Sequence, residues 1–247
     1  MLKEFVEKIL SLALPNTLTL DQLQYVDKHM TLVTPPAPAA VPCSTLQGLV
    51  DLWEGELDDA KKKGDLLVQI TSPTTVELIS READHYGRRR VWAAAKYPIT
   101  RGFAFGPWLD PETFIITAQQ HFQRVKIEND DGTFAKDLDY VLEIASKISS
   151  EEAVDHADDG ISQKVAVRSG ITLKTQATLK PLVDLAPYRT FAEIDQVISK
   201  FVFRARTQGG AVQLALFEAD GGRWQLAATA AIKAWLQPKF GDVRVIS

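Results

Sequence analysis

Short runs of alternating apolar and polar residues follow one another between residues 161 and 226, separated by turn-forming residues. This period of two is typical of strands that bury one face. The pairs Gly209-Gly210 and Gly221-Gly222 supply turns in which positive φ angles are tolerated. The pattern predicts an antiparallel sheet with strands over 162–168, 171–179, 183–191, 200–206 and 211–218, whose buried face carries Val165, Val167, Phe201 and Phe203.

Helical spacing of apolar residues occurs before this region and once after it. Asp110-Pro111-Glu112 is a helix start, because aspartate caps the first turn, proline fits the first helical position, and glutamate interacts favourably with the helix dipole. Further amphipathic helices are expected near 5–13, after Ser44 or Thr45, over 138–148 and around Trp235. The order predicts an α+β fold, with an antiparallel β-sheet from the C-terminal meander packed against several amphipathic helices.

Two strand-like runs, 66–80 and 90–97, flank a polar segment that contains Gly87 and several charges. Such a segment reverses the chain, so we expect a long β-hairpin over 66–97 with a charged, projecting tip. The proline-rich stretch before Cys43 cannot form a helix, because proline lacks the N–H donor and restricts its predecessor. We therefore expect an N-terminal helical arm over 1–34, a stiff connector over 35–43 and a main α+β domain over 44–247.

The composition is that of an ordinary folded protein, with 45% hydrophobic and 24% charged residues. The formal net charge of −4 gives no overall field that attracts nucleic acid or an anionic membrane. The single cysteine, Cys43, excludes an intramolecular disulfide and fits a reducing compartment. No window holds the ~18 apolar residues of a membrane span, and the N-terminus carries charges where a signal peptide is apolar. We expect a cytoplasmic protein without a membrane partner.

The charged tip of the expected hairpin carries candidates for ligand binding. Arg88 and Arg89 could hold phosphate groups through their planar guanidinium groups, and Tyr86 and Trp92 could stack on bases. These four residues predict a nucleotide or phosphate site. The alternative is a charged tip that discourages edge-to-edge pairing of strands. Consecutive arginines in a strand-like run also face alternate sides, so they cannot all address one ligand.

Carboxylates and a histidine crowd together at Asp155, His156, Asp158 and Asp159. Oxygen and imidazole ligands bind hard cations or transition metals, and a bound cation would lower the pKa of a coordinated water for hydrolysis. The alternative is an acidic, glycine-terminated loop that enters a strand. No second cluster of histidine or glutamate occurs at ligand spacing.

Motifs for catalysis or cofactor binding are missing from the sequence. Neither glycine pair has the arrangement of a phosphate-binding loop, and Ser169-Gly170 is expected to be a hairpin turn rather than a nucleophile elbow. The aromatic segment 102–109 could line a pocket or a subunit contact, but such a segment more often fills the core. We therefore expect no enzyme activity and no cofactor.

Four segments of the chain resemble the YfdQ-like proteins that tailed phages and prophages encode: ITLKT at 171–175, PYRTFAEIDQ at 187–196, FVFR at 201–204 and LFEADGG at 216–222. The similarity runs over most of the chain, and its strongest part follows Asp159. The resemblance implies a phage or prophage gene product, present in the bacterial host cytoplasm during infection. It carries no catalytic residue set, because the family has no settled activity.

Three functions follow, in order of preference. The first is a non-catalytic accessory protein that associates with itself through the arm and the hairpin, in a homo-oligomeric ring or capsid-like shell. The second is a module that binds a nucleotide or nucleic acid through Arg88 and Arg89, in phage recombination or counter-defence. The third is a metal-dependent hydrolase that uses the residues around His156.

Overall fold

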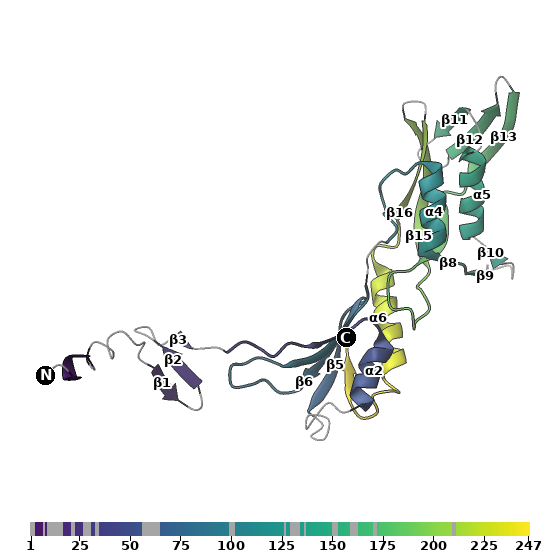
Figure 1. Cartoon of the computed structure of the whole chain (residues 1–247). Coiled ribbons are helices and arrows are strands. Elements are labelled where there is room, and N and C mark those ends of the chain that lie inside the picture. The colour runs from purple at the N-terminus through teal and green to yellow at the C-terminus, as the bar shows by residue number, and fades with distance from the viewer. Residues whose placement is uncertain are drawn as a thin grey trace.

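The computed structural model shows an elongated body from which an N-terminal arm extends (Figure 1). It describes residues 3–6, 8, 17–20, 23–26, 31–32, 35–55, 65–98, 102–125, 127–128, 134–135, 137–149, 153–158, 163–169, 172–208 and 211–247. The helices that it describes in the body are α2 (Leu46–Glu54), α4 (Pro111–His121), α5 (Asp137–Ser149) and α6 (Arg223–Leu236). Helices and mostly antiparallel strands occur in separate runs, so the expected α+β class is confirmed.

One end of the body contains a sheet of five strands: β4 (Val41–Cys43), β5 (Leu66–Ser72), β6 (Thr75–Ser80), β7 (Val91–Lys96) and β17 (Arg244–Ile246). Their order is β17-β5-β6-β7-β4, and the two outer strands pair in parallel with their neighbours. The expected hairpin over 66–97 is a three-stranded meander, because Pro73 and Thr74 turn the run 66–80 back on itself. Its charged segment, residues 81–90, joins β6 to β7 and is called the tip loop below.

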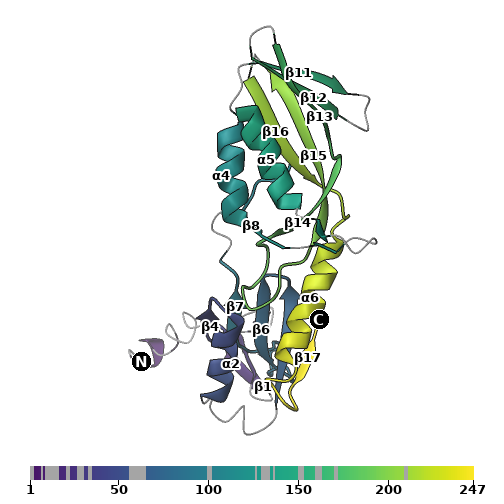
Figure 2. The ribbon, with the colours of Figure 1, turned by 90° about the vertical axis from the view of Figure 1, so that its right-hand side faces the viewer.

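Helices α2 and α6 cover one face of this sheet (Figure 2). Thr45 begins α2, because its side chain accepts a hydrogen bond from the Gly48 N–H at 3.0 Å. The helices and the sheet enclose a hydrophobic core, here called the first core, that includes Leu49, Val68, Leu78 and Ile232. Phe191 also lies in this core, although it belongs to a segment that connects strands of another sheet.

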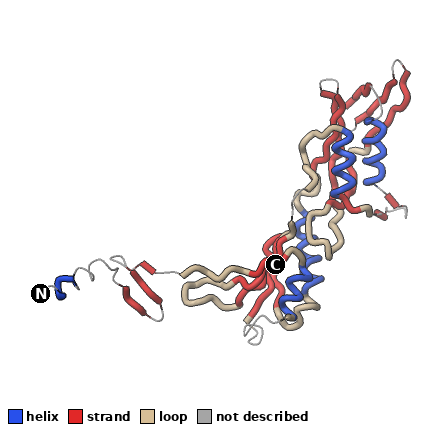
Figure 3. The backbone as a smooth tube through the Cα atoms, viewed as in Figure 1, coloured by secondary structure: helices blue, strands red, loops and turns tan. Residues whose placement is uncertain are grey.

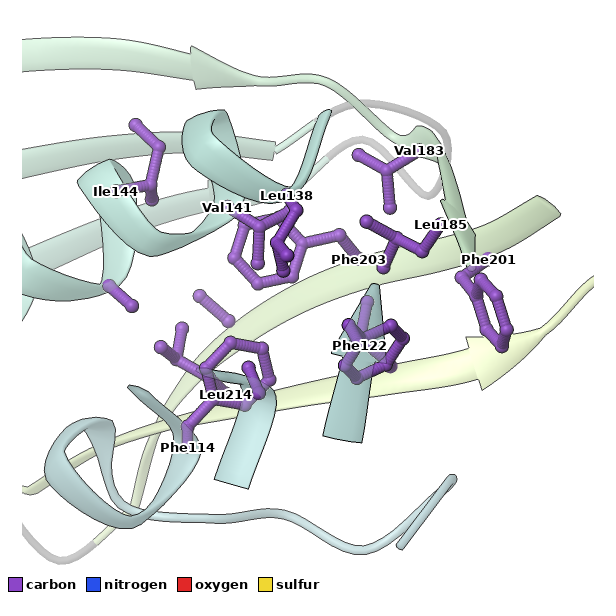
Figure 4. Packing of buried hydrophobic residues seen from close by; sticks show 14 of the residues in the cluster. Phe114, Phe122, Leu138, Val141, Ile144, Val183, Leu185, Phe201, Phe203 and Leu214 are labelled. Atoms are coloured by element: carbon purple, nitrogen blue, oxygen red, sulfur yellow. The ribbon is translucent and has the colours of Figure 1, made fainter. Parts of the chain in front are cut away.

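That other sheet consists of β8 (Phe122–Gln123), β14 (Leu182–Pro187), β15 (Ser199–Gln208) and β16 (Ala211–Glu218), in the order β16-β15-β14-β8. Helices α4 and α5 pack against it and enclose a second core, in which Phe114, Phe122, Phe203 and Leu214 converge (Figure 4). Phe201 and Phe203 are fully buried, as expected from the alternation along this strand. The segment 102–109 contributes Phe103 to the second core, which confirms its interpretation as a core segment.

A third sheet contains β11 (Ala153–Asp158), β12 (Gln163–Ser169) and β13 (Thr172–Leu179), and β11 and β12 contact β15. The C-terminal strands therefore form two sheets, and the expectation of one continuous meander was wrong. The chain changes sheet at Lys180 and Pro181, between β13 and β14. The burial of Val165 and Val167 lies outside the described residues. A short pair, β9 (Ile127–Glu128) and β10 (Phe134–Ala135), precedes α5.

The arm carries a small sheet of its own, formed by β1 (Thr17–Leu20), β2 (Leu23–Val26) and β3 (Thr31–Leu32). This sheet lies well away from the body, and residues 3–6 and 8 near the N-terminus are helical (Figure 1). Residues 35–40 run back to the body without regular secondary structure (Figure 3). The last three residues of the expected connector, 41–43, are strand β4 and thus belong to the five-stranded sheet. The expected main domain, 44–247, holds two hydrophobic cores.

Candidate functional site

The tip loop is built around the side chain of Asp84. One carboxylate oxygen accepts the backbone N–H groups of Tyr86 and Arg88, at 2.9 and 2.8 Å. The Asp84 N–H donates to the Arg88 carbonyl at 2.7 Å, and Gly87 takes the positive φ of 74° that this tight reversal requires. The hydrogen bond from the Arg88 backbone is the main cause that lowers the pKa of Asp84, and the Arg88 side chain adds to it.

The Arg88 guanidinium links the tip loop to the connector. Its Nε and Nη2 atoms donate to the other Asp84 oxygen at 3.1 and 2.9 Å, and Nη1 donates to the Pro35 carbonyl at 2.7 Å. The Tyr86 ring lies 4.9 Å from the same guanidinium. All three guanidinium nitrogens therefore have partners within the chain, and the contact joins segments 53 residues apart in sequence.

The other two members of the predicted nucleotide site lie at the base of the loop. Arg89 donates to the Ser80 carbonyl at 3.3 Å, and Trp92 donates to the Ser80 hydroxyl at 2.9 Å. Arg90, the third arginine of this run, stacks on Trp92 at 3.6 Å. The structure thus divides the four predicted residues into two pairs, one at each end of the loop. Their role in ligand binding stays a prediction.

Asp155, His156 and Asp158 lie on strand β11, so the alternative interpretation of this position as a loop was wrong for these three residues. Strand alternation places His156 and Asp158 on one face and Asp155 on the other. Asp159 lies outside the described residues. Within the ranges that the structure describes, no three side chains of histidine, cysteine, aspartate or glutamate are grouped closely enough to hold a metal ion.

A hollow of about 570 Å³ opens where α6 begins, next to β14 and β15. Two large apolar residues that line the hollow are exposed to solvent. The exposed fraction is 77% for Leu226 and 44% for Ile198. Asp184 and Lys200 form an ion pair at 3.1 Å on its wall. An open hollow that mixes exposed apolar side chains with charges of both signs is suited to contact with another protein surface.

Arg189 joins the second core to the start of α6. Its guanidinium donates to Glu218 and to Ser199, both at 2.6 Å, and stacks on Trp224 at 4.1 Å. Burial lowers the pKa of Arg189, and the charge of Glu218 opposes this effect. Asp220 accepts the N–H groups of Gly222 and Trp224, where the same helix begins. Sequence reasoning missed this cluster, because its members come from three distant segments without a shared motif.

The small sheet of the arm has an ordered pattern of apolar positions. The register pairs Leu18 with Tyr25 and Tyr25 with Leu32, and it pairs Leu20 with Leu23. Because residues two apart share a face, these five apolar positions all lie on one face of the sheet.

The comparisons with known proteins leave the chain without an assigned family. No protein-family model matches it, and neither a curated protein nor a solved structure is similar to it. No helix among the residues described above is long and apolar enough to cross a lipid bilayer. Functional proposals for the chain therefore depend on its own fold and contacts.

Proposed function

We propose that the protein is a non-catalytic subunit that assembles with copies of itself through its N-terminal arm. One observation carries this proposal: the sheet β1-β2-β3 lies away from the body (Figure 1), and its register places apolar residues at every position of one face. A sheet with this pattern needs a surface to cover its apolar face.

The sheet is too small to be stable without such a surface. Its strands contain four, four and two residues. Fixing each backbone residue costs about 1–2 kcal/mol in conformational entropy, and so small a sheet cannot recover this cost by pairing with itself alone. Burial of its apolar face against a second molecule would recover it, at about 25 cal/mol per Å² of apolar surface. A second copy of the chain is the partner that this proposal names, because most soluble assemblies are symmetric homo-oligomers.

Other surfaces of the body support an assembly. The tip loop projects beside the connector (Figure 3). Leu226 of α6 and Ile198, which precedes β15, are exposed around the hollow. An elongated subunit with a reaching arm, a projecting loop and an exposed apolar hollow suits a closed ring or a capsid-like shell, in which each copy contacts several neighbours.

The titratable groups with displaced pKa values support a structural role. Asp84 organises the tip loop, Asp110 caps α4, and Arg189 and Asp220 fix the start of α6. Burial is the main cause that raises the pKa of Cys43. Each shift thus accompanies a hydrogen bond or a degree of burial within the fold.

The biological setting follows from the resemblance to the YfdQ-like proteins. We propose that the chain is an accessory product of a tailed phage or prophage and acts in the bacterial host cytoplasm. Nucleotide binding and metal-dependent hydrolysis stay predictions from the sequence. The Arg88 guanidinium, which the first of these alternatives needs, already donates to Asp84 and Pro35.

Two substitutions in one strand of the arm test the assembly. Leu18 and Thr19 are neighbours in β1 on opposite faces, so Leu18→Asp places a charge on the apolar face and Thr19→Asp places it on the other. We expect size-exclusion chromatography with light scattering to give a large assembly for the wild type and for Thr19→Asp. Leu18→Asp should shift the protein to smaller species. Equal masses for all three proteins would count against assembly through the arm.

A further inference from the structure

We propose that the tip loop favours one direction in which the N-terminal arm leaves the body. It does so through the hydrogen bonds of Arg88 to Asp84 and to the Pro35 carbonyl. These bonds are called the Arg88 clamp below. The inference deepens the proposed function, because the direction of the arm determines where a neighbouring copy would stand. The clamp itself is a contact within one chain and can be tested separately.

The first step is the preorganisation of Arg88. Asp84 receives four hydrogen bonds, two from the backbone of the loop and two from the Arg88 guanidinium. The planar guanidinium is thus held by two of its nitrogens, and Tyr86 covers it at 4.9 Å. Its third nitrogen, Nη1, is left in a defined position and points at the connector. A lysine could not reproduce this geometry, because its ammonium group is a single point of contact.

The second step is the choice of acceptor. Pro35 opens the sequence Pro-Pro-Ala-Pro, whose prolines have no N–H group and cannot pair with a strand as donors. Such a segment is extended and semi-rigid over several residues. Its other end is fixed, since 41–43 pair with β7 in the five-stranded sheet. A stiff segment held at both ends, by β4 and by the Arg88 clamp, has one preferred direction.

The third step is the strength of the clamp. Arg88 and Asp84 are partly exposed, with 31% and 41% of their side-chain surfaces accessible. The hydrogen bond that reaches the connector, from Arg88 to the Pro35 carbonyl, is exposed as well, and a bond of this kind shifts an equilibrium by about fivefold. The clamp therefore favours one direction of the arm over others without locking it. An arm of this kind could still adjust when a neighbouring copy binds.

Distance measurement between two spin labels tests the clamp directly. Cys43 is the single cysteine, so a Cys43→Ser background with Ala37→Cys in the connector and Lys233→Cys on the exposed side of α6 carries one label where the arm leaves the body and one on the body. Dilution with an excess of unlabelled protein leaves only distances within one chain. We expect one dominant narrow peak in the distance distribution of this protein.

Substitution of Arg88 should broaden that distribution. Arg88→Ala removes the clamp, and Arg88→Lys keeps the charge beside Asp84 but loses the second and third donors. Both should replace the narrow peak by a broad one, while Arg89→Ala, which changes an adjacent arginine with a single 3.3 Å bond to Ser80, should not. An unchanged width in Arg88→Ala and Arg88→Lys overturns the clamp, and so does equal broadening in Arg89→Ala.

The outcome is separable from that of the assembly experiment. A protein that is monomeric but loses its narrow distribution in Arg88→Ala supports the clamp and contradicts assembly. A protein that assembles and keeps a narrow distribution in both Arg88 variants supports assembly and contradicts the clamp.

Discussion

Removal of the Phe191 ring tests how the two cores are held together. Phe191 is fully buried in the first core, 6.1 Å from Tyr97 in an edge-to-face arrangement, yet it belongs to the segment between β14 and β15. Its carbonyl accepts the Gln196 side-chain amide at 3.2 Å, which holds the segment in place. Because this hydrogen bond restrains the segment from moving into the space left by the ring, Phe191→Ala should leave a cavity. Phenylalanine-to-alanine changes of this kind cost about 3–5 kcal/mol, and we expect the upper half of that range.

Urea unfolding followed by tryptophan fluorescence measures this cost. Trp53, Trp92 and Trp235 pack against the first core and report its integrity. A loss of about 4 kcal/mol is a large share of the roughly 5–15 kcal/mol that stabilises most proteins. Ile198→Ala is the matched control, because Ile198 lies in the same segment with 44% of its surface exposed. A loss below about 1 kcal/mol for Phe191→Ala, or an equal loss for Ile198→Ala, would refute this account.

Three further changes probe individual contacts. Asp110→Ala should destabilise the fold by about 1 kcal/mol, since Asp110 accepts the Thr113 N–H that starts α4. That backbone hydrogen bond lowers the pKa of Asp110. The stabilisation of the fold by Asp110 is therefore present above about pH 4 and is lost as the pH falls through the folded-state pKa of Asp110. Asp110→Asn should flatten this part of the pH profile in thermal melts, and an unaltered profile would contradict it. Lys180→Ala should cost about 1–2 kcal/mol in urea, because among the described residues it leaves the buried Asp137 carboxylate with the Asp184 N–H as its remaining partner. No loss would show the pair to be dispensable. Gly222→Ala should cost about 1–2 kcal/mol by the same assay, because φ is 81° there, and a neutral result would mean that the backbone relaxes.

Local signals in the sequence located most elements of the fold. The aspartate–proline–glutamate start placed α4, whose cap is Asp110 as expected. Strand alternation predicted β15 and the burial of Phe201 and Phe203. The apolar spacing over 138–148 predicted α5. These predictions were confirmed because a helix cap, a strand alternation and a helical apolar stripe each depend on residues close together in the chain.

Long-range pairings had no such signal. The strands β4 and β17 join the five-stranded sheet in parallel, beside residues about fifty and about 180 positions away in sequence. Nothing in three-residue strands reveals such a partner. The division of the C-terminal strands between two sheets was missed for a related reason, since alternation assigns faces but not neighbours. The Arg88 clamp was missed because Pro35 takes part through its backbone carbonyl, which every residue has.

The mass of the unmodified chain in solution tests the central claim most directly. Sedimentation equilibrium over a series of concentrations gives this mass without labels or substitutions. Self-association through the arm predicts a defined multiple of the mass of one chain, which decreases only on strong dilution. A mass equal to that of one chain at every concentration would contradict the proposed assembly, whatever surface the arm presents.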